Sequence, residues 1–260
     1  WKFDSGVPAQ DPAVSHKTQE VSSSFAVVRG VAMVCAGPLW GLDARTGGVR
    51  WQANEAGGYA GAMTSPVSWH NPAGDFVLYA GMWRLVCLDP WNGRVRWEEE
   101  GSNVGHDYTP TPALEGDFMV AYFRGALRGY RLSLDRPQSL WEAPFHDPYS
   151  SPVLADGLVF TVGPEQSGGP TVATCRKSET GQIHWLNRDD TLKGAQYSSP
   201  VVAYGKLYVL VEKSKRLVTL DVKSGKLLGN ETVNALLWSS PAVADGMMYL
   251  RLADGLAAYD

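Results

Sequence analysis

The stretch SSPVLADGLVF at residues 150–160 decides the fold, because the chain repeats it as SSPVVAYGKLY at 198–208 and as SSPAVADGMMY at 239–249. Shorter copies begin at Thr64 and Thr111, and a degenerate copy begins at Ser23. Recurrence of one pattern every 40–50 residues is typical of stacked β units. Each copy places a glycine turn between two short apolar runs, which predicts a pair of antiparallel strands.

A second segment follows each first one and holds a tight turn with a tryptophan behind it. Its clearest copy runs from Asp43 through Thr46-Gly47 to Trp51. Aspartate caps the amides of such a turn, and glycine adopts the positive φ that the turn needs. The later copies end at Trp97, Trp141 and Trp185, while the fifth has Gly229 where tryptophan is expected. Each unit therefore contains four short strands.

A four-stranded sheet cannot bury both of its faces alone, and stacking such sheets around an axis solves that problem. We therefore predict an all-β, six-bladed β-propeller of four-stranded antiparallel blades. The blades begin near residues 23, 64, 109, 150, 198 and 239, and together they form one domain over residues 1–260.

The two ends of the chain suggest how the ring closes. The last repeat stops at Tyr259-Asp260, after its third strand, and Trp1-Lys2-Phe3-Asp4 looks like a fourth strand. We expect residues 1–6 to complete the last blade, so that the N-terminal strand pairs with the C-terminal blade. An eight-bladed ring trimmed at its ends is the alternative.

The turn pattern Asp-x-x-Thr-Gly-x-x-x-Trp resembles the tryptophan-docking motif of the PQQ-like (quinoprotein-type) propeller family. The resemblance implies that Trp1, Trp51, Trp97, Trp141 and Trp185 pack between neighbouring blades. That family includes quinone-dependent alcohol dehydrogenases and the propeller lipoprotein of the outer-membrane β-barrel assembly machinery. This chain lacks the adjacent cysteine pair and the long inserted loops of those dehydrogenases. We therefore expect no cofactor and no metal, and a closer similarity to the lipoprotein.

Large side chains stand just before the first strand of most repeats, where the loops open at one mouth of the central channel. They are Met63, Tyr108, Tyr149, Tyr197 and Trp238. We call this set the collar. Aromatic side chains offer a large contact area with a polar tip, which suits a peptide or a sugar face. The alternative is that they plug the channel and pack on one another.

Two His-Asp pairs, His106-Asp107 and His146-Asp147, lie beside the collar in adjacent blades. Histidine and aspartate together bind metals or move protons, but this spacing fits no established metal signature. A carboxylate that caps its own turn is the structural alternative. We predict that both pairs belong to a binding surface and that the chain has no catalytic residue. The glycine-rich insertion at 163–170 is expected on the same mouth.

Composition narrows the function. The net charge of −4 gives no basic face for nucleic acid, and no apolar run approaches the about 18 residues that span a membrane. The three cysteines are far apart in apolar runs, as buried free thiols are. We expect a monomeric, periplasmic or extracellular scaffold that binds a protein or peptide. An enzyme acting on a sugar or alcohol at the channel mouth, like a polysaccharide lyase or a quinoprotein dehydrogenase, is the other candidate.

Overall fold

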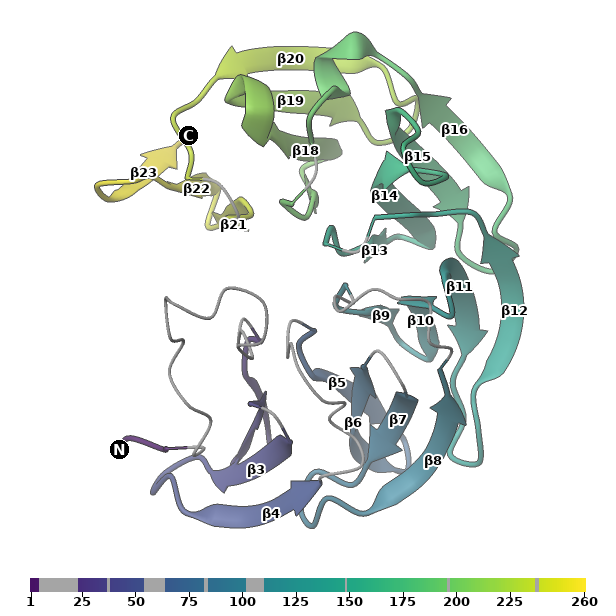
Figure 1. Ribbon diagram of the computed structural model, residues 1–260, viewed down its shortest axis with the longest axis vertical. Helices are drawn as coiled ribbons and strands as arrows, with labels where there is room; N and C mark the ends of the chain where they lie inside the picture. Colours follow the sequence, from purple (N-terminus) through teal and green to yellow (C-terminus); the bar gives the residue numbers. More distant parts are fainter. Residues whose placement is uncertain are drawn as a thin grey trace. The chain divides into compact units, whose positions relative to one another are not determined.

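The computed structural model describes residues 1–4, 23–36, 38–53, 64–81, 84–101, 110–147, 149–195, 197–236 and 239–260. These residues fall into two compact units, Trp1–Ser139 and Leu140–Asp260, with the boundary inside strand β12. All the regular structure that they form is β-strand, apart from two short 3-10 helices (Figure 1). The sequence prediction of an all-β chain is confirmed.

The first unit contains the sheets β1–β2–β3–β4 and β5–β6–β7–β8, followed by β9–β10–β11–β12, whose last strand crosses the unit boundary. Consecutive strands pair antiparallel, as in a meander. The strands of the first two sheets are β1 (Ala26–Val28), β2 (Val31–Cys35), β3 (Leu39–Asp43), β4 (Val49–Ala53), β5 (Val67–Asn71), β6 (Gly74–Ala80), β7 (Arg84–Leu88) and β8 (Val95–Glu100). Those of the third are β9 (Ala113–Glu115), β10 (Phe118–Phe123), β11 (Ala126–Arg131) and β12 (Gln138–Ala143).

The second unit repeats the same meander in β13–β14–β15–β16, in β17–β18–β19–β20 and in the three-stranded sheet β21–β22–β23. Its first sheet comprises β13 (Val153–Ala155), β14 (Leu158–Pro164), β15 (Thr171–Lys177) and β16 (Ile183–Asn187). The others comprise β17 (Val201–Ala203), β18 (Lys206–Val211), β19 (Arg216–Asp221), β20 (Leu227–Thr232), β21 (Ala242–Ala244), β22 (Met247–Arg251) and β23 (Leu256–Tyr259). The 3-10 helices η1 (Asp190–Leu192) and η2 (Glu212–Ser214) follow β16 and β18. Residues 1–4 have no strand assignment, so their pairing with the last sheet stays a prediction.

The glycine in each repeat has a clear backbone reason. Between β13 and β14, Asp156 and Gly157 have φ of 52° and 69°. Two successive residues with positive φ make the two-residue hairpin turn whose twist matches that of the strands. The same turn joins the first two strands in three other sheets, at Arg29-Gly30, Tyr204-Gly205 and Asp245-Gly246. The recurring motif therefore encodes a hairpin.

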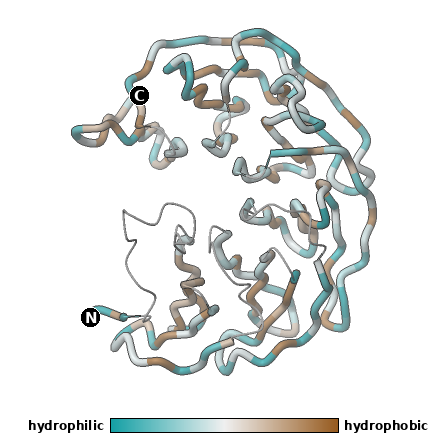
Figure 2. Tube along the Cα trace, viewed as in Figure 1, coloured by the Kyte–Doolittle hydropathy of each residue, from teal (hydrophilic) through white to brown (hydrophobic). Residues whose placement is uncertain are grey.

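The core lies between neighbouring sheets, because the second and third strands of the first four sheets are largely buried on both faces, whereas β23 of the last sheet is mostly exposed. Strand β10 is buried along its whole length, and so is β2. Figure 2 shows hydrophobic residues concentrated along these middle strands. The outer strands β4 and β8 are mostly exposed, and the buried residue in each is its tryptophan. A strand of this kind is covered on one face only.

Hydroxyl groups link the first strands of consecutive sheets within each unit. In the second unit the Ser151 amide donates to Ser199 Oγ at 3.0 Å, and the Ser199 amide donates to Ser240 Oγ at 2.9 Å. In the first unit the Ser24 amide donates to Ser65 Oγ at 2.9 Å, and the Ser65 amide donates to Thr111 Oγ1 at 3.0 Å. Ser65 and Ser199 thus each donate to one neighbouring sheet and accept from the other.

Candidate functional site

The five predicted docking tryptophans all bond to turns of another sheet. The Trp185 indole Nε1 donates to the Val222 carbonyl at 2.7 Å, and its ring packs on Gly225 in the β19–β20 turn. The other indoles make the same kind of bond, from Trp1 to Ala44 O, Trp51 to Pro90 O, Trp97 to Ser133 O and Trp141 to Ser178 O. Four of these tryptophans are buried, whereas Trp1 is 59% exposed. The motif therefore joins one sheet to the next.

The turns that receive these indoles are built by a carboxylate. Asp43 Oδ1 accepts from the Thr46 amide at 2.9 Å and from the Thr46 hydroxyl at 2.9 Å. The pKa of Asp43 is lowered, first by the hydrogen bond from the Arg50 guanidinium and then by those from Thr46. Asp221 caps its turn in the same way through Ser224, whose hydroxyl lowers the pKa of Asp221. The Asp-x-x-Thr-Gly pattern is thus a folding element.

Two residues of the predicted collar lie in the described part of the chain and touch each other. The rings of Tyr149 and Tyr197 meet edge to face, with their centroids 4.9 Å apart. Both side chains are half-buried. They precede β13 and β17, the first strands of their sheets, and these two strands lie side by side. The structure therefore places an aromatic pair, the tyrosine pair, where two adjacent first strands begin.

Asp147 lies two residues before Tyr149, in the same turn. It is 1% exposed, and its Oδ1 accepts from the amides of Tyr149 at 2.8 Å and of Ser150 at 3.2 Å. Burial is the main cause that raises the pKa of Asp147 to about 6, and the charge of Glu212 adds to it. The carboxylate thus caps its own turn, which was the structural alternative for the His-Asp pair.

His146 is half-buried, and its backbone amide donates to the Pro164 carbonyl at 2.8 Å. Gly163 packs against Asp147, because a Cβ there would come within 2.7 Å of the aspartate Cβ. The end of β14, where the glycine-rich insertion begins, therefore lies against the turn that carries Tyr149. The remaining predicted site residues, Met63, His106, Asp107, Tyr108 and Trp238, lie outside the described residues.

Sequence reasoning missed Glu212, which does for Tyr197 what Asp147 does for Tyr149. Glu212 is buried at the start of η2, and its Oε1 accepts from the Tyr197 amide at 3.1 Å and from the Ser198 amide at 2.5 Å. In the sequence Glu212 directly precedes the basic segment Lys213-Ser214-Lys215-Arg216, and it belongs to no repeated motif. Only the pairing of β17 with β18 brings it to the tyrosine.

Comparison with known proteins identifies the repeat. A family model described as outer membrane protein assembly factor BamB matches residues 12–187 and 172–260. The chain belongs to this PQQ-like family. Among curated proteins no sequence match was found.

Solved structures share the fold. BamB from Moraxella catarrhalis is 19% identical with a TM-score of 0.72, over 93% of this chain and 70% of that one. The computationally designed Ika8 protein is 14% identical with a TM-score of 0.66, over 91% and 70%. Quinohemoprotein alcohol dehydrogenase from Comamonas testosteroni is 14% identical with a TM-score of 0.58, over 83% and 43%. At these identities the matches show the fold alone, and they confirm that the six sheets are propeller blades.

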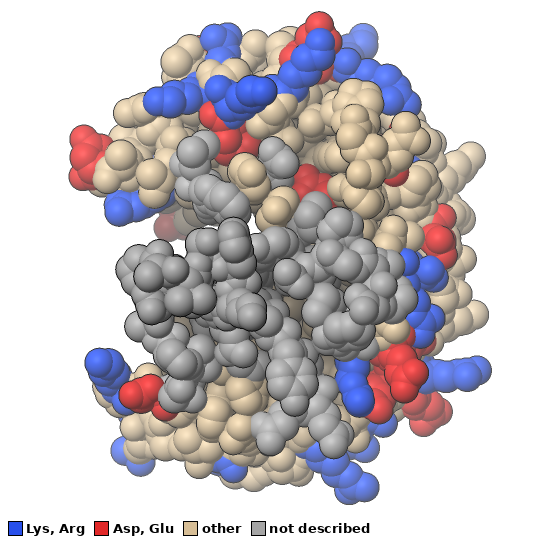
Figure 3. All heavy atoms as spheres, viewed as in Figure 1, with Lys and Arg blue, Asp and Glu red and all other residues tan. Residues whose placement is uncertain are grey.

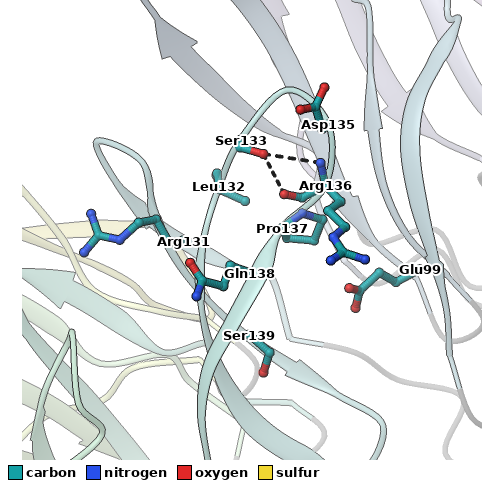
Figure 4. Close-up of a pocket in the computed structure, with 9 residues that line it drawn as sticks. All are labelled: Glu99, Arg131, Leu132, Ser133, Asp135, Arg136, Pro137, Gln138 and Ser139. Atoms are coloured by element: carbon teal, nitrogen blue, oxygen red, sulfur yellow. Dashed lines mark hydrogen bonds between the residues drawn. The ribbon is translucent and has the colours of Figure 1, made fainter.

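A hollow of about 640 Å³ lies beside a docking turn of the first unit (Figure 4). It is lined by Glu99, Arg131, Leu132, Ser133, Asp135, Arg136, Pro137, Gln138 and Ser139. Here the β11–β12 turn is stretched, and Ser133 Oγ bonds Arg136 in place of the usual Asp-Thr pair. Because Ser133 O also accepts the Trp97 indole, the hollow belongs to a docking turn and not to the tyrosine pair.

A second hollow of about 480 Å³ lies between the last two sheets of the second unit, lined by Tyr208, Leu217, Val243, Met248 and other residues. The sheet β17–β20, which forms one wall of this hollow, has Gly229 where the docking tryptophan is expected, and Gly229 pairs with Thr219 as Trp185 pairs with Cys175.

Within the described residues, no group of three or more His, Cys, Asp or Glu side chains is arranged to hold a metal ion. No helix in the described part of the chain has the length and apolar character that crossing a membrane requires. Both acidic and basic side chains are scattered over the described surface in the view of Figure 3. The thiols of Cys35, Cys87 and Cys175 are buried and form no disulfide, as the sequence predicted.

Proposed function

We propose that this protein is a non-enzymatic propeller scaffold of the bacterial envelope that binds a protein or peptide at the tyrosine pair. The family to which it belongs supports the first part, because that family model is described as an outer membrane protein assembly factor. A relative solved by crystallography is also a BamB. A factor that assembles outer membrane proteins has protein partners, and the same relationship supports the periplasmic location that we propose.

The observation that carries the binding site is the contact between Tyr149 and Tyr197. Two half-buried aromatic rings at 4.9 Å make a firm platform with polar edges. Tyrosine is enriched at the energetic centres of interfaces, because it buries much area with little loss of rotamer freedom. Buried carboxylates fix the backbone beneath both rings. A site whose geometry exists before binding loses less entropy when a partner arrives.

The test is capture of a partner from an envelope fraction with tagged wild-type protein and two variants. Tyr149→Ala with Tyr197→Ala removes both rings but keeps the backbone amides that Asp147 and Glu212 bind. Truncation of one central aromatic costs about 2 kcal/mol of binding free energy, or roughly thirtyfold in affinity. We expect the double variant to lose capture by at least that factor.

The matched control is Trp91→Ala. Trp91 is an exposed aromatic side chain on a docking turn of the first unit, where Arg50 stacks on it at 4.1 Å. Its removal should leave capture unchanged. Loss of capture in the control with full capture by the tyrosine variant would place binding on the docking turns instead, and would refute the proposal.

A further inference from the structure

In two adjacent sheets, a buried carboxylate accepts hydrogen bonds from the backbone amides of a tyrosine and of the serine that follows it. Asp147 accepts the amides of Tyr149 and Ser150, and Glu212 accepts those of Tyr197 and Ser198. The sources differ, since Asp147 comes from the turn itself and Glu212 from η2. Because each carboxylate fixes the residue whose ring touches the other ring, the tyrosine pair rests on two buried acids.

The environment of Asp147 is costly for a charge. Its Oδ2 is buried and has no hydrogen-bond partner in the described structure, and the same holds for the nearby Ser150 Oγ. Gly163, near the end of β14, packs directly against the Asp147 side chain. A buried carboxylate with one oxygen unpaired, facing a second acid, is a group that gains from binding a proton.

We propose that Asp147 and Glu212 make the tyrosine pair acid-responsive, so that a proton bound by Asp147 stabilises the closed turn that presents Tyr149 and Tyr197. This inference rests on the proposed binding role of the tyrosine pair. It assigns the proton as the regulator of that site, and Asp147 as the group that binds it. The pair is presented most firmly in mildly acid solution and less firmly above neutrality.

The charged groups around Asp147 support this assignment. On its own turn stands His146, and η2 brings Glu212 with the exposed Lys213 beside it. From the β14–β15 loop, Glu165 pairs with Arg188 at 3.3 Å and lies 3.7 Å from Arg176. The charge of Glu165 is therefore balanced by arginines, and Glu212 is the group whose charge acts on Asp147.

The size of the response follows from linkage. Opening the turn exposes Asp147 to water, where the pKa of an aspartate is about 3.8, whereas in the closed turn the pKa of Asp147 is about 6. The open form therefore releases the proton more readily, and raising the pH favours opening. With these two pKa values, opening becomes about tenfold more favourable between pH 5 and pH 7.

Amide hydrogen exchange of the whole chain tests this without any partner. We expect the protection factors of Tyr149 and Ser150, corrected for the intrinsic pH dependence of exchange, to fall about tenfold from pH 5 to pH 7. Asp147→Asn keeps the acceptor oxygen and removes the titration, so its protection should not vary with pH. Asp147→Ala lacks the acceptor, and its protection should be low at both pH values.

Histidine titrates in the same range, so His146→Gln is the necessary control. This variant should keep the tenfold change. Equal protection at pH 5 and pH 7 in the wild type would overturn the proposal, and so would an unchanged response in Asp147→Asn. If protection does not change with pH while the tyrosine double variant still loses partner capture, only the acid response is rejected. If protection changes with pH as expected while the tyrosine double variant captures partner as well as the wild type, only the binding role is rejected.

Discussion

Substitution of Gly225 by alanine tests whether the glycine of the docking turn is needed for two separate reasons. Gly225 has φ of 69°, a conformation that costs a residue with a Cβ about 1–2 kcal/mol. The added Cβ would also lie 2.5 Å from the Trp185 ring, closer than side-chain atoms approach. The indole must therefore move, and its bond to Val222 O is strained or lost.

The two costs add. A hydrogen bond contributes about 1 kcal/mol net, so Gly225→Ala should lower the free energy of unfolding by about 3 kcal/mol. For a domain of this size each kcal/mol shifts the melting temperature by about 2–4 °C, which gives a decrease of about 6–12 °C. Thermal unfolding followed by circular dichroism and tryptophan fluorescence measures both the shift and the loosening of the indole.

Gly229→Ala, four residues along the same hairpin, is the control. Gly229 lies inside β20, where a Cβ would meet only Thr219 at 3.7 Å, an ordinary contact. Glycine within a strand costs about 0.5–1 kcal/mol relative to alanine, so this variant should be slightly more stable than the wild type. If Gly225→Ala melts within 1–2 °C of Gly229→Ala, the docking turn does not hold the sheets together in the way argued from the Trp185 contact.

Three other predictions follow from the same contacts. Ser199→Ala leaves the Ser151 amide without its acceptor and should cost about 1–3 kcal/mol in urea unfolding, whereas Ser199→Thr should cost little because Thr111 fills that role in the first unit. Burial raises the pKa of Cys87 and of Cys175 to about 12, so a thiol reagent at pH 8 should react slowly with the native protein and count three thiols after denaturation; a count of one would reveal a disulfide. Because the folded pKa of Asp147 is raised above that of the unfolded chain, its contribution to stability is complete below about pH 4 and is lost as the pH rises through 6; Asp147→Asn should therefore gain about 3 kcal/mol on the wild type at pH 7.5 and about half as much at pH 5, and equal differences at both pH values would contradict this.

The sequence predicted the sheets well because the signals that define them are local and repeated. Asp156-Gly157 and Tyr204-Gly205 specify their hairpins within two residues, and the repeat supplies the same solution several times. The docking tryptophans were equally visible, because each stands at a fixed distance from its turn. Local backbone chemistry repeated in register is the kind of information that one chain carries openly.

The site was visible only in part. Tyr149 and Tyr197 were found because they occupy equivalent places in the repeat, and their contact follows from the stacking of β13 and β17. The role of the Ser-Pro motif was not predicted, since the acceptor of each serine amide is a hydroxyl 41–48 residues away in the chain. The spacing of residues within either repeat gives no sign of a hydrogen bond between the two sheets.

Glu212 shows why the acidic support of the tyrosines could not be read from the chain. The task is the same in both sheets, because two amides at the start of a first strand lack strand partners and need an acceptor. The fourth sheet meets it with an aspartate two residues before the tyrosine, a local cap that any turn analysis considers. The fifth sheet has no acid at that place and uses a glutamate fifteen residues after the tyrosine, which only the β17–β18 pairing returns to it. Different residues thus support one backbone geometry in neighbouring repeats, and their placement brings two carboxylates close enough for the charge of Glu212 to raise the pKa of Asp147.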